Sequence, residues 1–581
     1  MKLTVATADG ALEYSASDAP NFIVGPATAG SASAVQNFGE PSTLYQVYQR
    51  GKLPDCAALV FGQGVGPLSL LRLATSTAGS LPAYTVAASA ALPANTAAPG
   101  AFTALSFTGP ANIEVVFGAG WDGGNVTLTG TDANGAAQTE TITAAAGSAV
   151  KGNKVFGTLT GAVKASVGAT ANTATLQRGN KTAAGTSTST SQLVLSGTPN
   201  DDGRVVFSVT RDGDPAATPL PAYSVSYDGG DTFGPETAVP TGGVITLDNG
   251  LTATLSGSAC KAGDAFTQDA SGPTSTSLDV SAALAVLSTL NVDGGELLIL
   301  GGVSGAITAV VNSWIASERA ASRDWQVYLH TRDYSSASET DSAYVASLQT
   351  DFAGLQEPVG ALSVIPGYWE TVIPGGRGIQ RRSFAWAVCA QLWRLPFYVH
   401  PSCQEDGGGA LRGLHTVAAA GTPRTHDERT SPGLGGSGGR FLTVQSLPGS
   451  ENLGQWFVGD YAGKRSPGTL APGTSDWSLL MNARLANRTR RFVQSYGARL
   501  LAARYATLAN GTLTSAERKR VESKVSKALK RYLGPAVQDL RVVVSATEPI
   551  LTSKKLPYQV FLRSWSYALE VVSIIGLQGA E

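Results

Sequence analysis

The fold class is decided by three short apolar segments in the second half of the chain: LLIL at 297–300, WQVYL at 325–329 and ALSVI at 361–365. Helical patterns precede or separate them, at residues 280–290, 307–322 and 341–355. Strands that alternate with helices in this way indicate an α/β layer. We therefore predict a main α/β domain over residues 276–470, with long loops in its Gly-rich part.

The start of the chain is expected to contribute to the same core. Phe22–Gly25 reads as a buried strand that is stopped by the Gly-Pro pair. Residues before it alternate weakly, with Leu3 and Val5 on one side, which predicts an extended arm. We assign residues 1–18 to this arm and residues 19–95 to the first part of the α/β core.

All-β patterns occupy the region between these two parts. The Ala-, Pro- and Thr-rich stretch 81–110 predicts a linker. Beyond it, strands such as Ile113–Phe117 and Val205–Val209 recur between turn signals that include Asp-Gly and Asn-Gly. Short strands at this spacing predict small sandwiches with an immunoglobulin-like appearance. We place one such domain at 96–180 and a second β module at 190–275.

The last hundred residues predict two helices followed by paired strands. A helical segment runs from about Trp477 to Ala509, and Asn510-Gly511 provides a left-handed stop. Thr514 and Glu517 have the spacing of a capping box at the start of the second helix. This helix is expected to bury one stripe: Val521, Val525, Ala528, Leu529 and Tyr532. Strands follow near 540–545, 558–563 and 567–577, and we assign residues 471–581 to one C-terminal domain.

Composition and cysteine spacing argue against a disordered chain, a disulfide scaffold and a zinc ribbon. The chain has 581 residues, of which 43% are hydrophobic and 15% charged, with a net charge of −1. This length suggests roughly three to five domains, and the apolar content is enough for packed cores. The four cysteines lack C-x-x-C spacing, so buried free thiols are expected. We expect a protein that is not secreted by the usual route, because the N-terminus has no apolar leader core.

Three stretches together resemble a known family, the contractile tail-sheath subunits of myophages and related injection machines. The first is FIVGPATAG at 22–30 with NFGE at 37–40. The second pairs YSVSYDGGDTF at 223–233 with AGDAF at 262–266. The third is the C-terminal arrangement of helix, helix and paired strands over residues 482–576. The resemblance covers about half of the chain, and the order of the parts carries it.

This resemblance implies an α+β multidomain fold. An α/β sheath core would lie near the tail axis, with inserted all-β, Ig-like outer domains and extended terminal strand arms. It also implies a structural subunit without enzymatic activity or a cofactor, which polymerises helically around a tail tube and contracts to drive the tube through the host envelope. Its partners would be further copies of the chain, the tail tube protein, the baseplate and the tail terminator, without nucleic acid or membrane insertion. The location would be the virion tail, assembled in the host cytoplasm.

Two surfaces follow as candidate sites. An exposed apolar terminal strand promotes aggregation unless it is paired, and in sheath-like proteins terminal arms add strands to neighbouring subunits. The residues expected in this pairing are Leu3, Val5, Leu569, Val571, Val572, Ile574 and Ile575. The alternative is that the last strand is the central strand of its own domain.

The second surface is basic. Residues 477–532 carry thirteen Arg or Lys against two acids. We expect part of this excess to face an acidic tail tube, and the alternatives are a solvated helix face and, less favoured, nucleic-acid binding. The residues predicted to face the tube are Arg488, Arg491, Arg499, Arg518, Lys524, Lys527 and Arg531.

Catalytic motifs are incomplete in this sequence. Gly435–Gly439 fits G-x-S-x-G only formally, and 459–466 lacks the spacing of a phosphate loop. The best enzyme hypothesis is a hydrolase or metal cluster at His415, His426, Asp427 and Glu428, although their spacing is not that of a helical metal motif. The rival functions are therefore an Ig-decorated surface adhesin or carbohydrate-binding phage protein, and a glycan hydrolase.

Overall fold

The computed structural model of the chain describes residues 20–564, except for 83, 89–99, 103–104, 106, 108–109, 122, 144–146, 167–172, 187, 231, 302–303, 336–338, 353–360, 374–378, 404–406, 415–424, 435–440, 447–455, 459–479, 498–499, 501–502 and 554–555. The chain divides into two compact units. Unit 1 consists of Met1–Ala74, Ser275–Pro374 and Arg381–Glu581, and unit 2 of Thr75–Thr274 and Gly375–Gln380. Unit 2 is thus inserted into unit 1.

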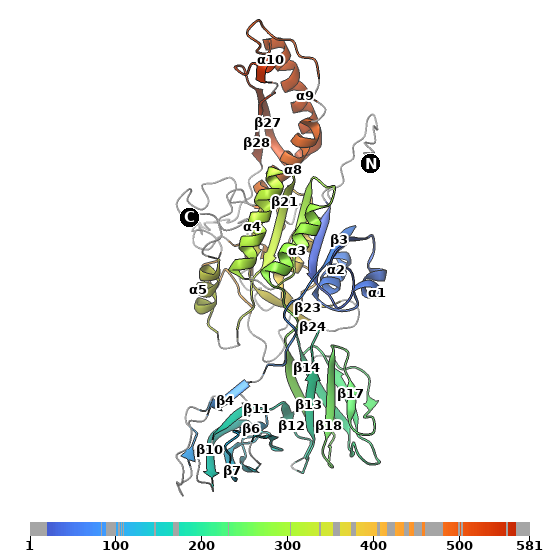
Figure 1. Cartoon of the computed structure of the whole chain (residues 1–581), viewed down its shortest axis with the longest axis vertical. Coiled ribbons are helices and arrows are strands. Elements are labelled where there is room, and N and C mark those ends of the chain that lie inside the picture. Colours follow the sequence, from blue (N-terminus) through green and yellow to red (C-terminus); the bar gives the residue numbers. More distant parts are fainter. Residues whose placement is uncertain are drawn as a thin grey trace, which may run out of the picture. The chain divides into compact units, whose positions relative to one another are not determined.

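A six-stranded sheet forms the centre of unit 1 (Figure 1). Its strand order is β2-β3-β1-β20-β21-β22, and all neighbours are parallel except β2 and β3. The strands are β1 (Asn21–Pro26), β2 (Gln36–Phe38), β3 (Leu68–Leu73), β20 (Gly294–Ile299), β21 (Asp324–His330) and β22 (Leu362–Ile365). The three segments that predict the α/β layer therefore lie in adjacent, parallel strands of one sheet.

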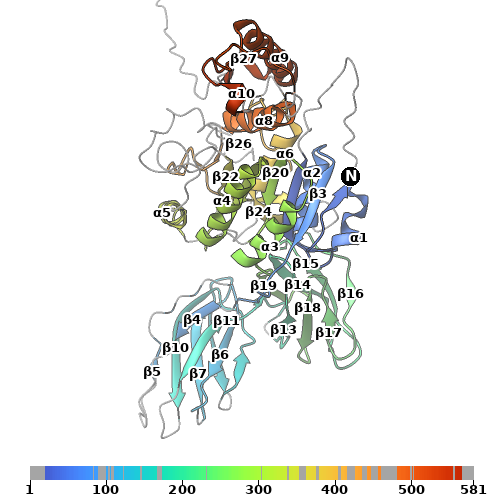
Figure 2. The same ribbon diagram turned by 45° about the horizontal axis from the view of Figure 1, so that its top comes forward.

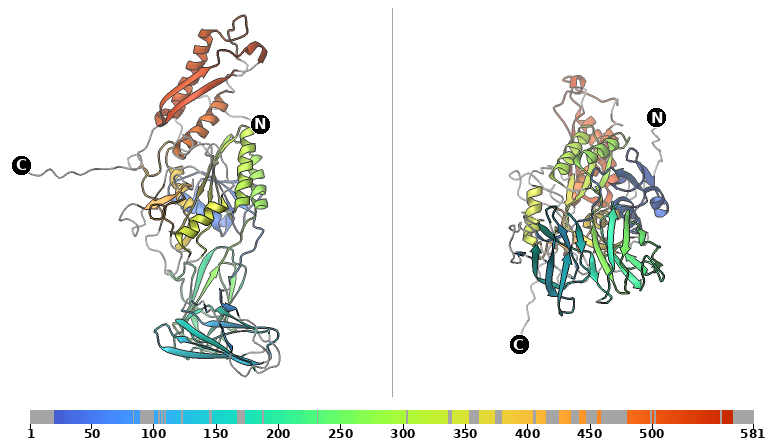
Figure 3. Two further views of the ribbon diagram at one scale, coloured as in Figure 1. Left: turned by 90° about the vertical axis from the view of Figure 1, so that its left-hand side faces the viewer. Right: turned by 60° about the horizontal axis from the view of Figure 1, so that its bottom comes forward.

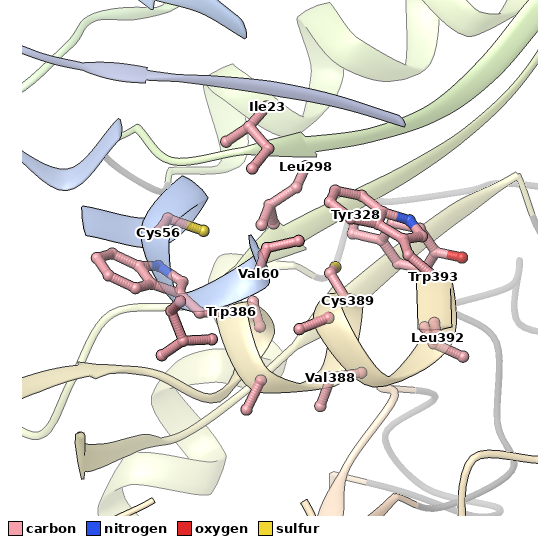
Figure 4. Packing of buried hydrophobic residues seen from close by; sticks show 14 of the residues in the cluster. Ile23, Cys56, Val60, Leu298, Tyr328, Trp386, Val388, Cys389, Leu392 and Trp393 are labelled. Carbon is pink, nitrogen blue, oxygen red and sulfur yellow. The ribbon is translucent and has the colours of Figure 1, made fainter. Parts of the chain in front are cut away.

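Helices cover both faces of this sheet, which explains why its strands are mostly apolar on both faces. On one face α2 (Lys52–Gly62) and α6 (Phe384–Arg394) pack against residues such as Ile23 and Leu298 (Figure 4). On the other face lie α3 (Ser277–Ser288) and α4 (Gly305–Ala320), with α5 (Asp341–Asp351) packed into the same core (Figure 2). The remaining short elements are η1 (Pro41–Thr43), α1 (Leu44–Tyr48), β23 (Tyr368–Val372), β24 (Ile379–Ser383), β25 (Val444–Ser446) and β26 (Trp456–Val458).

The C-terminal part of unit 1 has a hydrophobic core of its own. Its elements are α8 (Leu480–Gly497), α9 (Ser515–Leu533), η4 (Gly534–Ala536), β27 (Val537–Val544), α10 (Ile550–Ser553) and β28 (Tyr558–Ser564). The first of the two predicted helices is shorter than expected. It ends at Gly497, and Asn510-Gly511 lies instead in a turn, where the Leu508 N–H donates to the Thr512 carbonyl oxygen (N···O 2.7 Å).

Unit 2 contains two pairs of β-sheets, and each pair encloses one core. The first pair has the orders β5-β10-β7-β8 and β4-β11-β6-β9. Its strands are β4 (Tyr84–Ala88), β5 (Gly100–Ala101), β6 (Ile113–Phe117), β7 (Gly124–Thr131), β8 (Ala137–Thr143), β9 (Ala149–Lys151), β10 (Thr158–Ser166) and β11 (Ala174–Arg178). Strand β4 lies inside the stretch expected to be a linker, because its pairing with β11 outweighs the low β propensity of that stretch.

The second pair has the orders β12-β19-β14-β15-β16 and β13-β18-β17. Its strands are β12 (Lys181–Ala183), β13 (Gln192–Gly197), β14 (Gly203–Arg211), β15 (Ala222–Ser226), β16 (Thr237–Ala238), β17 (Val244–Thr246), β18 (Leu251–Ser256) and β19 (Ala265–Ala270). At its core edge Lys181 and Asp264 are fully buried, with the Lys181 Nζ 3.9 Å from the Asp264 Oδ1. Asp264 also accepts hydrogen bonds from the hydroxyls of Ser189 and Ser191, so the buried carboxylate is well compensated.

The two ends of the inserted segment are hydrogen-bonded to each other. Within unit 2, Thr77 and Thr274 form an antiparallel bridge, and so do Ser80 and Ser271. Within unit 1, the Ser275 hydroxyl donates to the Ala74 carbonyl oxygen at 2.8 Å. The chain therefore leaves and re-enters unit 1 at adjacent positions.

Candidate functional site

The β27–β28 hairpin of the C-terminal part forms a separate two-stranded sheet. The two strands pair only with each other among the described residues, so both edges of this sheet are open. One face is covered by α9, whose buried residues pack onto the hairpin (Figure 3, left). They are Val521, Val525, Leu529 and Leu533. A two-stranded hairpin is only marginally stable alone, so α9 supplies the packing that keeps it folded and its edges available.

The capping of α9 agrees in part with the sequence. The Thr514 side chain accepts a hydrogen bond from the Glu517 N–H at 3.2 Å, as expected of an N-cap. The Glu517 carboxylate pairs with Arg520, and this hydrogen-bonded guanidinium holds the pKa of Glu517 below its ordinary value. The predicted buried stripe is confirmed for Val521, Val525 and Leu529, whereas the last turn buries Leu533 and leaves Tyr532 half-buried.

A basic surface covers the side of α9 opposite to the hairpin. Both acids of the helix are engaged, because Glu517 pairs with Arg520 and Glu522 accepts from the Val544 N–H at 2.9 Å. The exposed cations of this basic surface are Lys519, Arg520, Lys524, Lys527, Lys530 and Arg531. The helix therefore separates an apolar face from a strongly positive one.

The seven residues that were expected to face a tube differ in how far the structure exposes them. Lys524, Lys527 and Arg531 are exposed on the basic surface, and Arg518 is half-buried. Arg488 is buried, with its guanidinium 5.1 Å from the centre of the Phe397 ring, so it is not part of any exposed surface of this chain. Arg491 is half-buried, and Arg499 lies outside the described residues. Helical spacing alone does not reveal that α8 turns its arginines inward.

The residues predicted to pair with neighbouring subunits lie outside the described residues. These are Leu3, Val5, Leu569, Val571, Val572, Ile574 and Ile575. What the structure does describe is the hairpin immediately before the C-terminal segment, since β28 ends at Ser564.

In the histidine-containing loop, on which the enzyme hypothesis depends, the polar side chains form hydrogen bonds that hold the loop itself in place. His415 lies outside the described residues, and His426 is buried with its Nε2 3.3 Å from the Glu428 Oε2. Glu428 also accepts from two backbone amides of the loop, and Asp427 accepts from the N–H and hydroxyl of Ser446. Among the described residues, no three His, Cys, Asp or Glu side chains are grouped so that they could hold a metal ion.

Two further properties of the described residues are the state of the cysteines and the hydropathy of the helices. Cys56, Cys260 and Cys389 are buried and free, and Cys403 is partly exposed and free. Burial raises the pKa of the Cys260 thiol to about 11, which keeps this thiol protonated and unreactive. No helix in the described part is long and apolar enough to cross a membrane.

Comparison with known proteins gives structural neighbours of one kind. No protein-family model and no curated protein matches the chain. The sheath tail protein of Desulfitobacterium hafniense is 12% identical, with a TM-score of 0.39, over 95% of this chain and 98% of that protein. The sheath tail protein Lin1278 of Listeria innocua is 9% identical, with a TM-score of 0.36, over 94% of this chain and 95% of its own.

A third neighbour is the sheath complex of an extracellular contractile injection system in its contracted state. It is 11% identical, with a TM-score of 0.35, over 52% of this chain and 81% of the neighbour. The structural neighbours are thus sheath tail proteins and a contractile injection system sheath.

Proposed function

We propose that this chain is a structural subunit of a contractile tail sheath, which polymerises helically around a tail tube. The observation that carries the proposal is the β27–β28 hairpin, which is covered by α9 on one face and open at both edges among the described residues. Open edges accept strands from other chains by β-augmentation. The apolar segment 567–577 follows the hairpin directly and has the composition of a donor strand.

Strand exchange of this kind generates a filament when it does not close on itself. Each subunit gives its terminal segments to neighbours and accepts theirs, and a head-to-tail contact that fails to close produces a helical stack. Such a mesh keeps subunits joined while their bodies move during a single contraction. The proposed partners are further copies of the chain, the tube inside, and the baseplate and terminator at the ends of a virion tail.

The basic surface of α9 is proposed to hold the tube. Its exposed cations, of which only Arg520 is paired within the helix, match an acidic partner surface by charge, and contacts of this kind weaken with salt, which suits attachment that must be released. No catalytic step is part of this proposal, because the extended assembly itself would store the free energy of contraction. The β sandwiches of unit 2 are proposed as Ig-like outer domains.

Electron microscopy of the purified full chain tests the assembly. We expect tubes or rings from the full chain and monodisperse particles from a version that ends at Trp565. A sharper variant combines Val571→Pro and Ile574→Pro, because proline removes two N–H donors from a strand ladder without shortening the chain. Its matched control is Ser573→Ala in the same segment. Monodisperse particles from the full chain at every salt and protein concentration would refute the proposal.

The alternative function is an Ig-decorated adhesin or carbohydrate-binding phage protein. It predicts that the full chain stays monodisperse and that unit 2 binds a glycan. Glycan-array binding by a full chain that forms no tubes, unchanged by the two proline substitutions, would favour this alternative.

A further inference from the structure

Helix α8 faces the central sheet of unit 1 with charged residues where a helix of this length normally places apolar ones. It packs over the face that α6 also covers, against β21, and reaches Glu296 of β20 through a side chain. Arg484, Asn487 and Arg488 are all buried there, at the i, i+3 and i+4 spacing of a contact stripe. Arginine is rarely buried unless it is paired, so this contact is unusual.

The strands of the sheet carry buried polar residues that contact this face of α8. The Arg484 Nη2 lies 3.0 Å from the Glu296 Oε1, and both side chains are almost fully buried. The other oxygen of Glu296 accepts from the Tyr328 hydroxyl and the Trp393 indole N–H, each at 3.0 Å. Every oxygen of this carboxylate is therefore engaged, and Glu296 is the centre of the contact.

A second carboxylate extends the contact along the helix. The Asp324 Oδ1 lies 3.1 Å from the Arg490 Nε and 3.7 Å from the Arg319 Nε. Between the two carboxylates, the Asn487 amide donates to the Gln326 Oε1 at 2.8 Å. We call this row of contacts the α8 seam: Glu296, Asp324, Gln326, Arg484, Asn487 and Arg490.

Beyond the seam, α8 is bound to the C-terminal part rather than to the sheet. Leu485 lies in the same core as α9 and the hairpin, and the Phe492 ring stacks on Tyr532 with centroids 4.3 Å apart. Only the first residues of α8, such as Leu480 and Met481, lie in the apolar core next to the sheet. Past its first turn, the helix is thus held on one side by hydrophobic packing and on the other by directional polar contacts.

These two kinds of contact respond differently to strain. Hydrophobic packing tolerates small shifts and adds stability with area, whereas a dry ion pair contributes little net stability but defines one geometry and fails once a partner is lost. A helix that is held by hydrophobic packing on one side and by ion pairs on the other is therefore expected to detach on the ion-paired side.

We propose that the α8 seam is the line along which the C-terminal part of the chain undocks from the central sheet as one body, with α8, α9 and the β27–β28 hairpin remaining together. Glu296 holds this body in place. The inference concerns the single chain and goes beyond assembly. Its link to contraction rests on the proposed function, in which a body that stays in the mesh must move against the rest of its own subunit.

Amide hydrogen exchange of the full, unassembled chain tests the proposal. Glu296→Gln leaves Arg484 buried without its charge partner, and exchange should accelerate on the order of 100-fold across α8, α9, β27 and β28 together. Amides of β1, β20 and β21 should keep their wild-type rates. The matched control is Asp55→Asn, which breaks another buried pair of unit 1, Asp55–Arg382 (3.5 Å), and should leave α8 to β28 unchanged.

A milder variant covers the case in which Glu296→Gln does not fold. Arg490→Ala removes the partly exposed end of the seam, since this side chain is 44% exposed. We expect a smaller acceleration over the same set of amides. Acceleration that is equal in the sheet and in the C-terminal part, or no acceleration by either variant, would overturn the proposal.

Discussion

Helix α9 should determine whether the chain assembles, and Leu529 is the residue through which we would test this. Its side chain is fully buried in the core between α9 and the hairpin. Leu529→Ala removes three carbons from that core, which amounts to ~2.4 kcal/mol of transfer free energy. The cavity that remains raises the expected loss to about 3–4 kcal/mol. That loss is large for a hairpin whose one covered face depends on this helix.

Urea unfolding followed by circular dichroism, with electron microscopy of the same samples, measures the effect. We expect the C-terminal part of Leu529→Ala to unfold at lower urea than the rest of the chain, and tubes to be lost. The control is Lys527→Ala on the exposed side of the same helix, which should change stability by less than about 0.5 kcal/mol. A Leu529→Ala protein with wild-type unfolding and wild-type tubes would refute the role we give to α9.

Three further predictions concern other parts of the chain. Asp264→Ala leaves Lys181 buried without its carboxylate and should lower the stability of unit 2 by about 3–5 kcal/mol in urea unfolding, whereas Asp212→Ala at an exposed pair should change it little. Arg332 holds the pKa of Glu339 at about 2, so this pair should stabilise the folded chain above pH ~4.5 and lose that contribution as the pH falls towards 2. Proteolysis should become faster over this range, and Glu339→Gln should show the faster cleavage already at neutral pH. Thr276→Ala removes the half of the α3 capping box in which the Thr276 hydroxyl accepts from the Asp279 N–H, and should cost about 1 kcal/mol in thermal unfolding, while Ser277→Ala should not.

The central sheet of unit 1 could be predicted because its strands contain short apolar runs that are recognisable without knowing which distant residues they contact. Each strand is buried on both faces, so LLIL and WQVYL stand out from their surroundings without knowledge of their neighbours. The amphipathic α9 is equally readable, since its buried and exposed faces alternate with the helical period. Helix α6 was not predicted, because all but its last residue are buried and it shows no polar face from which a period could be read.

The candidate site was predicted less well than the fold, and charge is the reason. Counting Arg and Lys over residues 477–532 treats every cation as solvent-exposed, yet Arg484 and Arg488 are buried. The compensating carboxylates are more than 150 residues away in the chain, in β20 and β21, so no local window contains both partners. A carboxylate inside an otherwise apolar strand, as at Glu296, is the signal that such a partner must exist.

The junction between the two units, at Ala74 and Ser275, should accept a foreign domain in place of the inserted segment. Because residues 74 and 275 are joined by a hydrogen bond, a short loop of a few residues could close unit 1 after excision of the segment between them, at a small loop-closure entropy. By the same geometry, any folded domain whose own termini are neighbours fits this position without stretching the parallel sheet. If such chains form tubes, each tube would display the grafted domain once per subunit, at a density fixed by the helical lattice.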